Sequence, residues 1–291
     1  MSYAHVVVGP DQLWQTWAPE PVLLAAAAVA GLAYGRGARA LRAVGAGARS
    51  LPRRRVVAFY AGLVVGTASI TSPLGALSET LFSAHMIQHL LLMLLAAPLL
   101  VYGAPATVVP MALPRGPRVA LHRPAWGIRR ARRILCSALV VGTLYAAAMW
   151  AWHLPALYEW ALRNEGAHTF EHAAFLSAAA LFWWAVLEPS RRIGFGAALL
   201  LTFATMLQSA ALGALLTLAS QPLYDAHAAG AEAWGLTLLQ DQQLAGALMW
   251  VPPGIVYVST MAVLLGRWLK HAERRTARAE VRSVTAGATK P

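Results

Sequence analysis

The chain has 291 residues, of which 58% are hydrophobic and 12% are charged, and its formal net charge is +12. Soluble domains have about 45–50% apolar and about 25% charged residues, so this composition excludes an ordinary soluble globule, a disordered chain and a secreted disulfide scaffold. The arginines lie in short segments between apolar stretches, and no nucleic-acid-binding motif accompanies them. We therefore expect a polytopic membrane protein whose arginines lie in the loops between its membrane spans, with no nucleic-acid partner.

Seven stretches are apolar enough, and most of them long enough, to cross the roughly 30 Å hydrocarbon core of a bilayer as helices. No strand alternation and no second domain is visible, so we predict an all-α bundle of seven transmembrane helices. This single membrane domain covers residues 1–270, and a basic tail covers residues 271–291. The expected spans, in chain order, are 20–35, 56–74, 82–102, 134–154, 169–188, 195–218 and 242–266.

The positive charges alternate between the two sides of this arrangement. Residues 36–55, residues 115–133 and residues 267–290 each contain seven Lys or Arg residues, and the fifth loop adds two more. The segments on the opposite side contain only Arg163. Because cytoplasmic loops carry the excess of Lys and Arg, we predict an N-terminus outside the membrane and a cytoplasmic C-terminus.

Most of the histidines fall on the predicted outer side, and four of them form two pairs. His85 and His89 in HMIQH are four residues apart, so they share one helix face about 6 Å apart along the axis. His168 and His172 in HTFEH repeat this spacing, with Glu171 beside them. Two such pairs on packed helices could complete a metal site, and ionisable groups at membrane depth need water, a partner or a metal.

The donor types favour copper. The single cysteine, Cys136, lies at the predicted cytoplasmic end of the fourth span, so a thiolate site is excluded. His153 ends the same span on the outer side, and Met86 adjoins the first histidine pair. Imidazole suits copper and zinc, and an added thioether favours Cu(I).

Other interpretations of the same residues remain open. HTFEH matches the H-x-x-E-H zinc-protease pattern, in which His168 and His172 would hold zinc and Glu171 would activate water. His89 and His172 could instead ligate a b-type haem from opposite sides. Histidines at helix ends can also be plain interfacial residues, and methionines such as Met93 can be packing residues, which would leave a metal-free scaffold.

Asp241 begins the seventh predicted span after a long outer loop. An Asp at this position can cap its own helix, because its carboxylate accepts from the backbone of the first turn. It could also turn toward the histidines and orient an imidazole. These two roles predict different results for Asp241→Asn, since Asn caps about as well as Asp.

Several longer motifs stand in a familiar order. They are HMIQHLLLMLLAAPLL followed by GAP, then WHLPALYEWAL, HTFEHAAFLSAAALFWW and DQQLAGALMWVPPG. Together they cover the third to seventh spans, and in this order the chain resembles the CtaG-like cytochrome c oxidase assembly family of bacterial seven-span membrane proteins.

The resemblance implies a role in maturing an aa3- or caa3-type terminal oxidase in the bacterial plasma membrane, without an enzymatic activity of its own. It implies an oxidase subunit and a copper donor protein as partners. The motif positions that carry over comprise metal ligands and supporting residues. The candidate ligands are His85, Met86, His89, His153, His168 and His172, and the candidate supporting residues are Glu171, Asp241, Gln242 and Met249.

Overall fold

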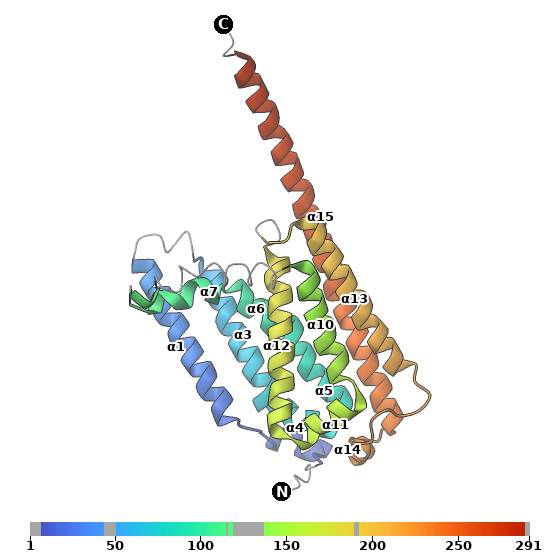
Figure 1. The fold of residues 1–291 in the computed structure, drawn as a ribbon. Coiled ribbons are helices and arrows are strands. Elements are labelled where there is room, and N and C mark those ends of the chain that lie inside the picture. The colour runs from blue at the N-terminus through green and yellow to red at the C-terminus, as the bar shows by residue number, and fades with distance from the viewer. Residues whose placement is uncertain (1–6, 44–50, 115, 119–136, 189–191, 289–291) are drawn as a thin grey trace.

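The computed structural model describes residues 7–43, 51–114, 116–118, 137–188 and 192–288, and every regular element within these ranges is helical (Figure 1). The all-α prediction is therefore confirmed for this part of the chain. The single cysteine, two of the histidines and several of the basic residues lie outside the described ranges. These are His5, Arg49, Arg115, His122, Arg123, Arg129, Arg130, Arg132, Arg133, Cys136, Arg191 and Lys290.

The described chain contains five helical stretches that are long and apolar enough to cross a membrane, or up to seven if each of two bent helix pairs counts as one span. The long helices include α1 (Pro21–Ala43), α12 (Glu165–Leu187), α13 (Phe195–Thr217) and α15 (Leu238–Ala288). Another long stretch is built from consecutive elements. They are α5 (Phe82–Leu90), the π-helical segment η2 (Leu91–Ala96), α6 (Ala97–Tyr102), α7 (Pro105–Val108) and η3 (Val109–Ala112).

Prolines explain both bent pairs. Helix α3 (Arg53–Thr71) is followed by α4 (Pro73–Thr80) at 48°, and α10 (Ala138–Trp152) is followed by α11 (Pro155–Arg163) at 73°. Proline has no backbone N–H and clashes with the preceding turn, so it ends one helix and suits the first position of the next. The bends place the short helices α4 and α11 across one end of the bundle (Figure 1).

That end of the bundle also contains η1 (Pro10–Gln15) and α14 (Ala228–Ala233), and we call it the histidine end. The Val8 N–H donates to Thr80 Oγ1 at 3.1 Å, and the Trp234 indole donates to the Val8 carbonyl at 2.8 Å. The N-terminal segment, α4 and α14 therefore lie together, while α15 projects far beyond the opposite end (Figure 1).

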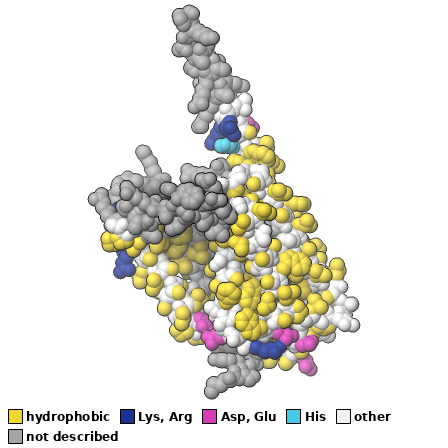
Figure 2. Space-filling model, in the orientation of Figure 1, with side chains coloured by type: hydrophobic (Ala, Val, Ile, Leu, Met, Phe, Trp, Pro, Cys, Tyr) yellow, Lys and Arg dark blue, Asp and Glu magenta, His cyan; other side chains and the backbone are white. Residues whose placement is uncertain are grey.

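The surface has the pattern of a membrane protein. Hydrophobic side chains cover the middle of the bundle, and charged side chains gather toward its two ends (Figure 2). Val22, Leu139 and Leu218 are each at least 80% exposed. A belt of exposed leucine and valine is unfavourable in water, and it is expected where the surface faces lipid.

Small residues bring α13 and α15 close together. A Cβ on Gly213 would lie 2.9 Å from the Gly246 carbonyl oxygen, and one on Gly246 would lie 2.7 Å from the Gly213 carbonyl oxygen. Helices in lipid associate through such close backbone approach. This packing holds α15 beside the helices that carry the histidines.

Candidate metal centre

Two helices bring three ionisable side chains into the interior near the histidine end. Helix α5 carries His85 and His89 one turn apart, and α12 carries Glu171. Their exposed fractions are 0%, 4% and 1%. The i,i+4 spacing puts both imidazoles on the face of α5 that meets α12, as the sequence predicted.

The three groups converge on one point. Glu171 Oε1 lies 3.8 Å from His85 Nε2 and 3.9 Å from His89 Nε2. One ligand atom from each residue lies within 4.8 Å of the other two. These separations are longer than hydrogen bonds, and they leave a space that a metal ion with bonds of about 2 Å could occupy after a small contraction.

These atoms have no hydrogen-bond partner among the described residues. Both ring nitrogens of His85 and His89 and both carboxylate oxygens of Glu171 are buried without a hydrogen bond. Buried polar groups are nearly always hydrogen-bonded, because an unpaired polar group is costly to remove from water. Such a cluster of nitrogen and oxygen donors could hold a metal ion, which would compensate all of these groups at once.

The second histidine pair flanks this group without joining it. The His168 and His85 rings are stacked with centroids 5.5 Å apart, and the His172 and His89 rings meet edge to face at 5.3 Å. His172 Nε2 hydrogen-bonds Gln88 Oε1 at 3.1 Å, and Gln88 Nε2 donates to a backbone carbonyl of α3 at 2.9 Å. Because the Gln88 oxygen accepts, His172 carries its proton on Nε2, and this nitrogen has no lone pair for a metal.

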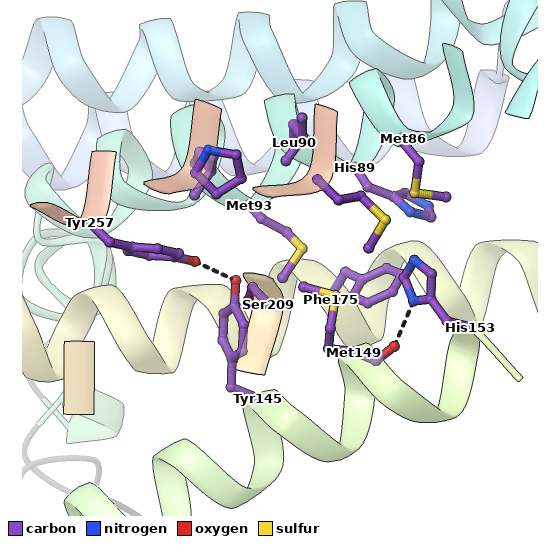
Figure 3. A pocket seen from close by; sticks show the side chains of 13 residues that line it. Met86, His89, Leu90, Met93, Tyr145, Met149, His153, Phe175, Ser209 and Tyr257 are labelled. Carbon is purple, nitrogen blue, oxygen red and sulfur yellow. Dashed lines mark hydrogen bonds between the residues drawn. The ribbon is translucent and has the colours of Figure 1, made fainter. Parts of the chain in front are cut away.

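Three other predicted site residues line a small cavity next to the histidine–glutamate group. Met86, His153 and Met249 lie around a space of about 20 Å³, and His89 lies on its border (Figure 3). His89 is thus the residue that the group and the cavity share.

Asp241 has a role that neither sequence interpretation anticipated. It does not cap its own helix, because α15 begins at Leu238 and Thr237 forms a reciprocal capping box with Gln240. Its carboxylate instead accepts from the backbone N–H of Phe82 at 2.7 Å and of Ser83 at 3.0 Å, and from Ser83 Oγ at 2.5 Å. Asp241 therefore caps α5, the helix that carries His85 and His89.

Gln242 also contacts backbone and not the histidines. Its Oε1 accepts from the Leu223 N–H at 2.6 Å, and its Nε2 donates to the Leu216 carbonyl at 3.5 Å. It holds the segment after α13 against the start of α15. The hydrogen bonds of Gln242 are therefore with the backbone of α13 and of the segment that follows it.

A layer of aromatic residues covers the group on the side of the histidine end, and we did not predict it from the sequence. The Tyr158 ring lies 5.3 Å from the His85 ring, and its hydroxyl is hydrogen-bonded to His227 Nε2 at 2.7 Å. The Tyr224 hydroxyl donates to the His153 carbonyl at 2.6 Å. Burial raises the pKa of Tyr224, which keeps its hydroxyl protonated as a donor. The sequence signal that could have identified this layer is the WHLPALYEWAL motif, which contains Tyr158.

Comparison with known proteins identifies relatives but no solved structure. An uncharacterized protein of Mycobacterium bovis and one of Mycobacterium tuberculosis are each 27% identical over 275 residues, and one of Mycobacterium leprae is 26% identical. The matches cover 90–91% of this chain but only 41% of those relatives. No solved structure matches the chain.

A protein family accounts for most of the chain. The model of the cytochrome c oxidase caa3 assembly factor family (Caa3_CtaG) matches residues 32–271, which include every residue of the histidine–glutamate group and of the cavity lining. This match confirms the resemblance inferred from the motifs. The chain belongs to the cytochrome c oxidase caa3 assembly factor family.

Proposed function

We propose that this protein is an integral-membrane assembly factor that binds copper at His85, His89 and Glu171 and helps to deliver it to a cytochrome c oxidase subunit. Copper is the cargo, received from a donor protein and passed on. The family assignment supports the oxidase as the recipient. The proposal assigns no reaction to the chain, only binding and release.

One observation carries this proposal. Two imidazoles and a carboxylate, all at least 96% buried, converge within 4.8 Å and have no hydrogen-bond partner among the described residues. At membrane depth such groups need compensation, and a bound cation supplies it for all three at once. A scaffold without metal gives no reason to bury them unpaired.

The local geometry favours copper over the two enzymatic or redox alternatives. A zinc protease of the H-x-x-E-H type would gather Glu171 with His168 and His172, yet the structure groups Glu171 with His85 and His89, and His172 Nε2 donates to Gln88. A haem would separate His89 from His172, yet these rings are in edge-to-face contact at 5.3 Å and the adjoining cavity measures about 20 Å³. Imidazole with nearby thioethers is a donor set suited to copper.

We further propose seven spans in a bacterial plasma membrane, with the histidine end outside. Each bent pair then crosses once, and the division of Lys and Arg between the two sides supports this orientation. A reporter fused near Gly230 should be external, and one fused after Pro291 should be cytoplasmic. Finding both reporters on the same side would contradict the seven-span topology.

The copper site is tested by metal retention. Full-length protein purified in detergent and loaded with copper should retain about one ion per chain at this centre, and His85→Leu combined with His89→Leu should abolish that retention. The measurement is elemental analysis after gel filtration, paired with oxidase maturation in cells that depend on the variant. His271→Leu is the matched control, because His271 is exposed and lies at the opposite end of the bundle. Unchanged copper in the double variant would refute the centre.

A further inference from the structure

The cavity beside the histidine–glutamate group has an unusual lining. The chain contains eight methionines, and four of them lie among the 13 residues around this one space. They come from three helical stretches: the continuous α5 and η2 contribute Met86 and Met93, α10 contributes Met149, and α15 contributes Met249. The lining contains no carboxylate, lysine or arginine.

The residues that line the cavity follow the helix axes from one of its ends to the other. Along α10 and its C-terminal cap residue, Tyr145, Met149 and His153 follow one another at one-turn intervals, about 6 Å each along the axis. The Tyr145 and Tyr257 hydroxyls are hydrogen-bonded at 2.8 Å and close one end. His89, His153 and Met86 lie at the other end, and the sulfur atoms of Met93 and Met149 lie between the two ends (Figure 3).

His153 presents an unpaired nitrogen donor. Its Nδ1 lies 2.6 Å from the Met149 carbonyl oxygen, so Nδ1 carries the proton and donates it. Its Nε2 therefore keeps the lone pair, and this atom is buried without a hydrogen bond among the described residues. His153 is only 6% exposed and forms part of the cavity lining.

The backbone around Met93 is specialised. Met93 lies in the π-helical segment η2, and its carbonyl accepts the Trp183 indole N–H at 2.8 Å. π-Helical turns are rare and occur frequently at functional sites, because the wide turn re-aims side chains. Trp183, on α12, thereby holds the turn that presents Met93 to the cavity.

We propose that this cavity is a second metal site, which takes a soft monovalent cation of the Cu(I) class through Met86, Met93, Met149, Met249 and His153 Nε2. Thioethers are neutral, soft donors, so they suit Cu(I) or Ag(I) and not a hard divalent ion. The volume of about 20 Å³ holds one water-sized or ion-sized occupant and no organic ligand. The inference rests on the proposed function in so far as the cargo of both sites is copper.

Packing alone does not account for this arrangement. Methionine fills irregular gaps in cores and makes contacts between sulfur and aromatic rings, and Phe175, Tyr145 and Tyr257 do line the cavity. If the methionines served only to pack the core, they would fill this space. Here the four flexible side chains surround a cavity that stays open. It would also leave the unpaired His153 nitrogen unexplained.

His89 connects the two sites. It belongs to the histidine–glutamate group and also lines the cavity, and its ring lies 4.6 Å from that of Phe175, which in turn lies 6.1 Å from the His153 ring. A cation can therefore exchange ligands from Glu171 and His85 to the thioethers while His89 stays bound. The ion keeps its charge throughout, and no electron is transferred.

The experiment titrates the detergent-purified full chain with two probes under anaerobic conditions. Ag(I) reports soft sites, and Co(II) reports the nitrogen–oxygen centre by its visible absorption. The wild type should bind about two Ag(I) and about one Co(II) per chain. Met93→Leu combined with Met149→Leu should lose one Ag(I) and keep Co(II), and His85→Leu should lose Co(II) and keep one Ag(I). Leucine conserves the volume of methionine, so the fold is preserved.

Met206→Leu combined with Met261→Leu is the matched control, because neither residue lines the cavity. Full Ag(I) binding in the Met93 and Met149 variant would overturn the second site. Loss of all Ag(I) in His85→Leu would also overturn it, because it would mean one composite site. Absence of Co(II) binding in the wild type, together with methionine-dependent Ag(I) binding, would refute the histidine–glutamate centre and leave the thioether site standing.

Discussion

Two regions of this protein bury polar groups in opposite ways. Between α1, α3 and α6, the fully buried Tyr34 stacks on Phe59 with ring centroids 3.8 Å apart, and its hydroxyl donates to the Gly103 carbonyl at 2.8 Å. Between α5 and α12, His85, His89 and Glu171 are as deeply buried and have no hydrogen bond among the described residues. The first arrangement stabilises the fold. The second is unfavourable by itself, because its polar groups are buried without partners, and the surrounding fold holds it in place.

The same contrast exists within one helix. At the start of α5, the backbone N–H groups of Phe82 and Ser83 are satisfied by Asp241, whereas one turn later the imidazole of His85 is unsatisfied. A helix whose first turn is held by a tertiary contact can keep its next turns in position without local partners. In this protein the satisfied buried polar groups hold the fold together, and the unsatisfied ones form the metal centre that we propose.

The largest effect is expected at Asp241. Asp241→Ala should lower the free energy of unfolding by about 3 kcal/mol, because it leaves two buried backbone donors and the Ser83 hydroxyl without an acceptor. Asp241→Asn should cost about 1–2 kcal/mol, since the amide offers only one acceptor oxygen. Denaturant titration in mixed micelles measures both. Asp225→Ala is the control, because Asp225 is an exposed acid at the same end of the bundle. An unchanged free energy of unfolding in Asp241→Ala would contradict the stabilising role of the Asp241 contacts with the first turn of α5.

A smaller effect is expected at Tyr34. Tyr34→Phe keeps the stacked ring but removes the partner of a buried carbonyl, so stability should fall by about 1 kcal/mol while copper retention stays unchanged. The same unfolding and metal measurements test this. Tyr60→Phe is the matched control, because Tyr60 also donates to a carbonyl but is 39% exposed. Equal losses in the two variants would show that burial does not set the value of the hydrogen bond.

The smallest effect is expected in metal-free protein that carries His85→Leu and His89→Leu. Apolar residues of similar size replace unpaired imidazoles, so the free energy of unfolding should be unchanged or slightly higher. Added copper should stabilise the wild type, by about 2.7 kcal/mol for each site at a free concentration 100 times its Kd, and should stabilise the variant less, through the thioether site alone. A large destabilisation of the metal-free variant would show that the histidines are structural after all.

Much of the candidate site could be predicted from the sequence because it depends on local helix geometry. The spacings of HMIQH and HTFEH placed two histidine pairs on helix faces, and the order of the motifs identified the family. The sequence could not predict which of the two histidine pairs gathers with Glu171. His172 is hydrogen-bonded to Gln88, whereas Glu171 points at His85 and His89. The rotation of α12 against α5 decides this, and packing across the whole bundle sets that rotation.

The sequence by itself determined the membrane class, the helical elements and the side of the molecule on which the histidines gather, because hydropathy and a period of 3.6 residues act within one segment. Only the tertiary structure decided where Asp241 directs its carboxylate and which four methionines meet. Asp241 bonds to Phe82 across 159 positions of the chain, and Met86 and Met249, which line the same cavity, are 163 positions apart, so no local pattern encodes either arrangement. Asp241 could satisfy its own helix or another. Its carboxylate bonds to α5 because Thr237 and Gln240 already cap the start of α15. This leaves the Asp241 carboxylate free to hold α5 and its histidines.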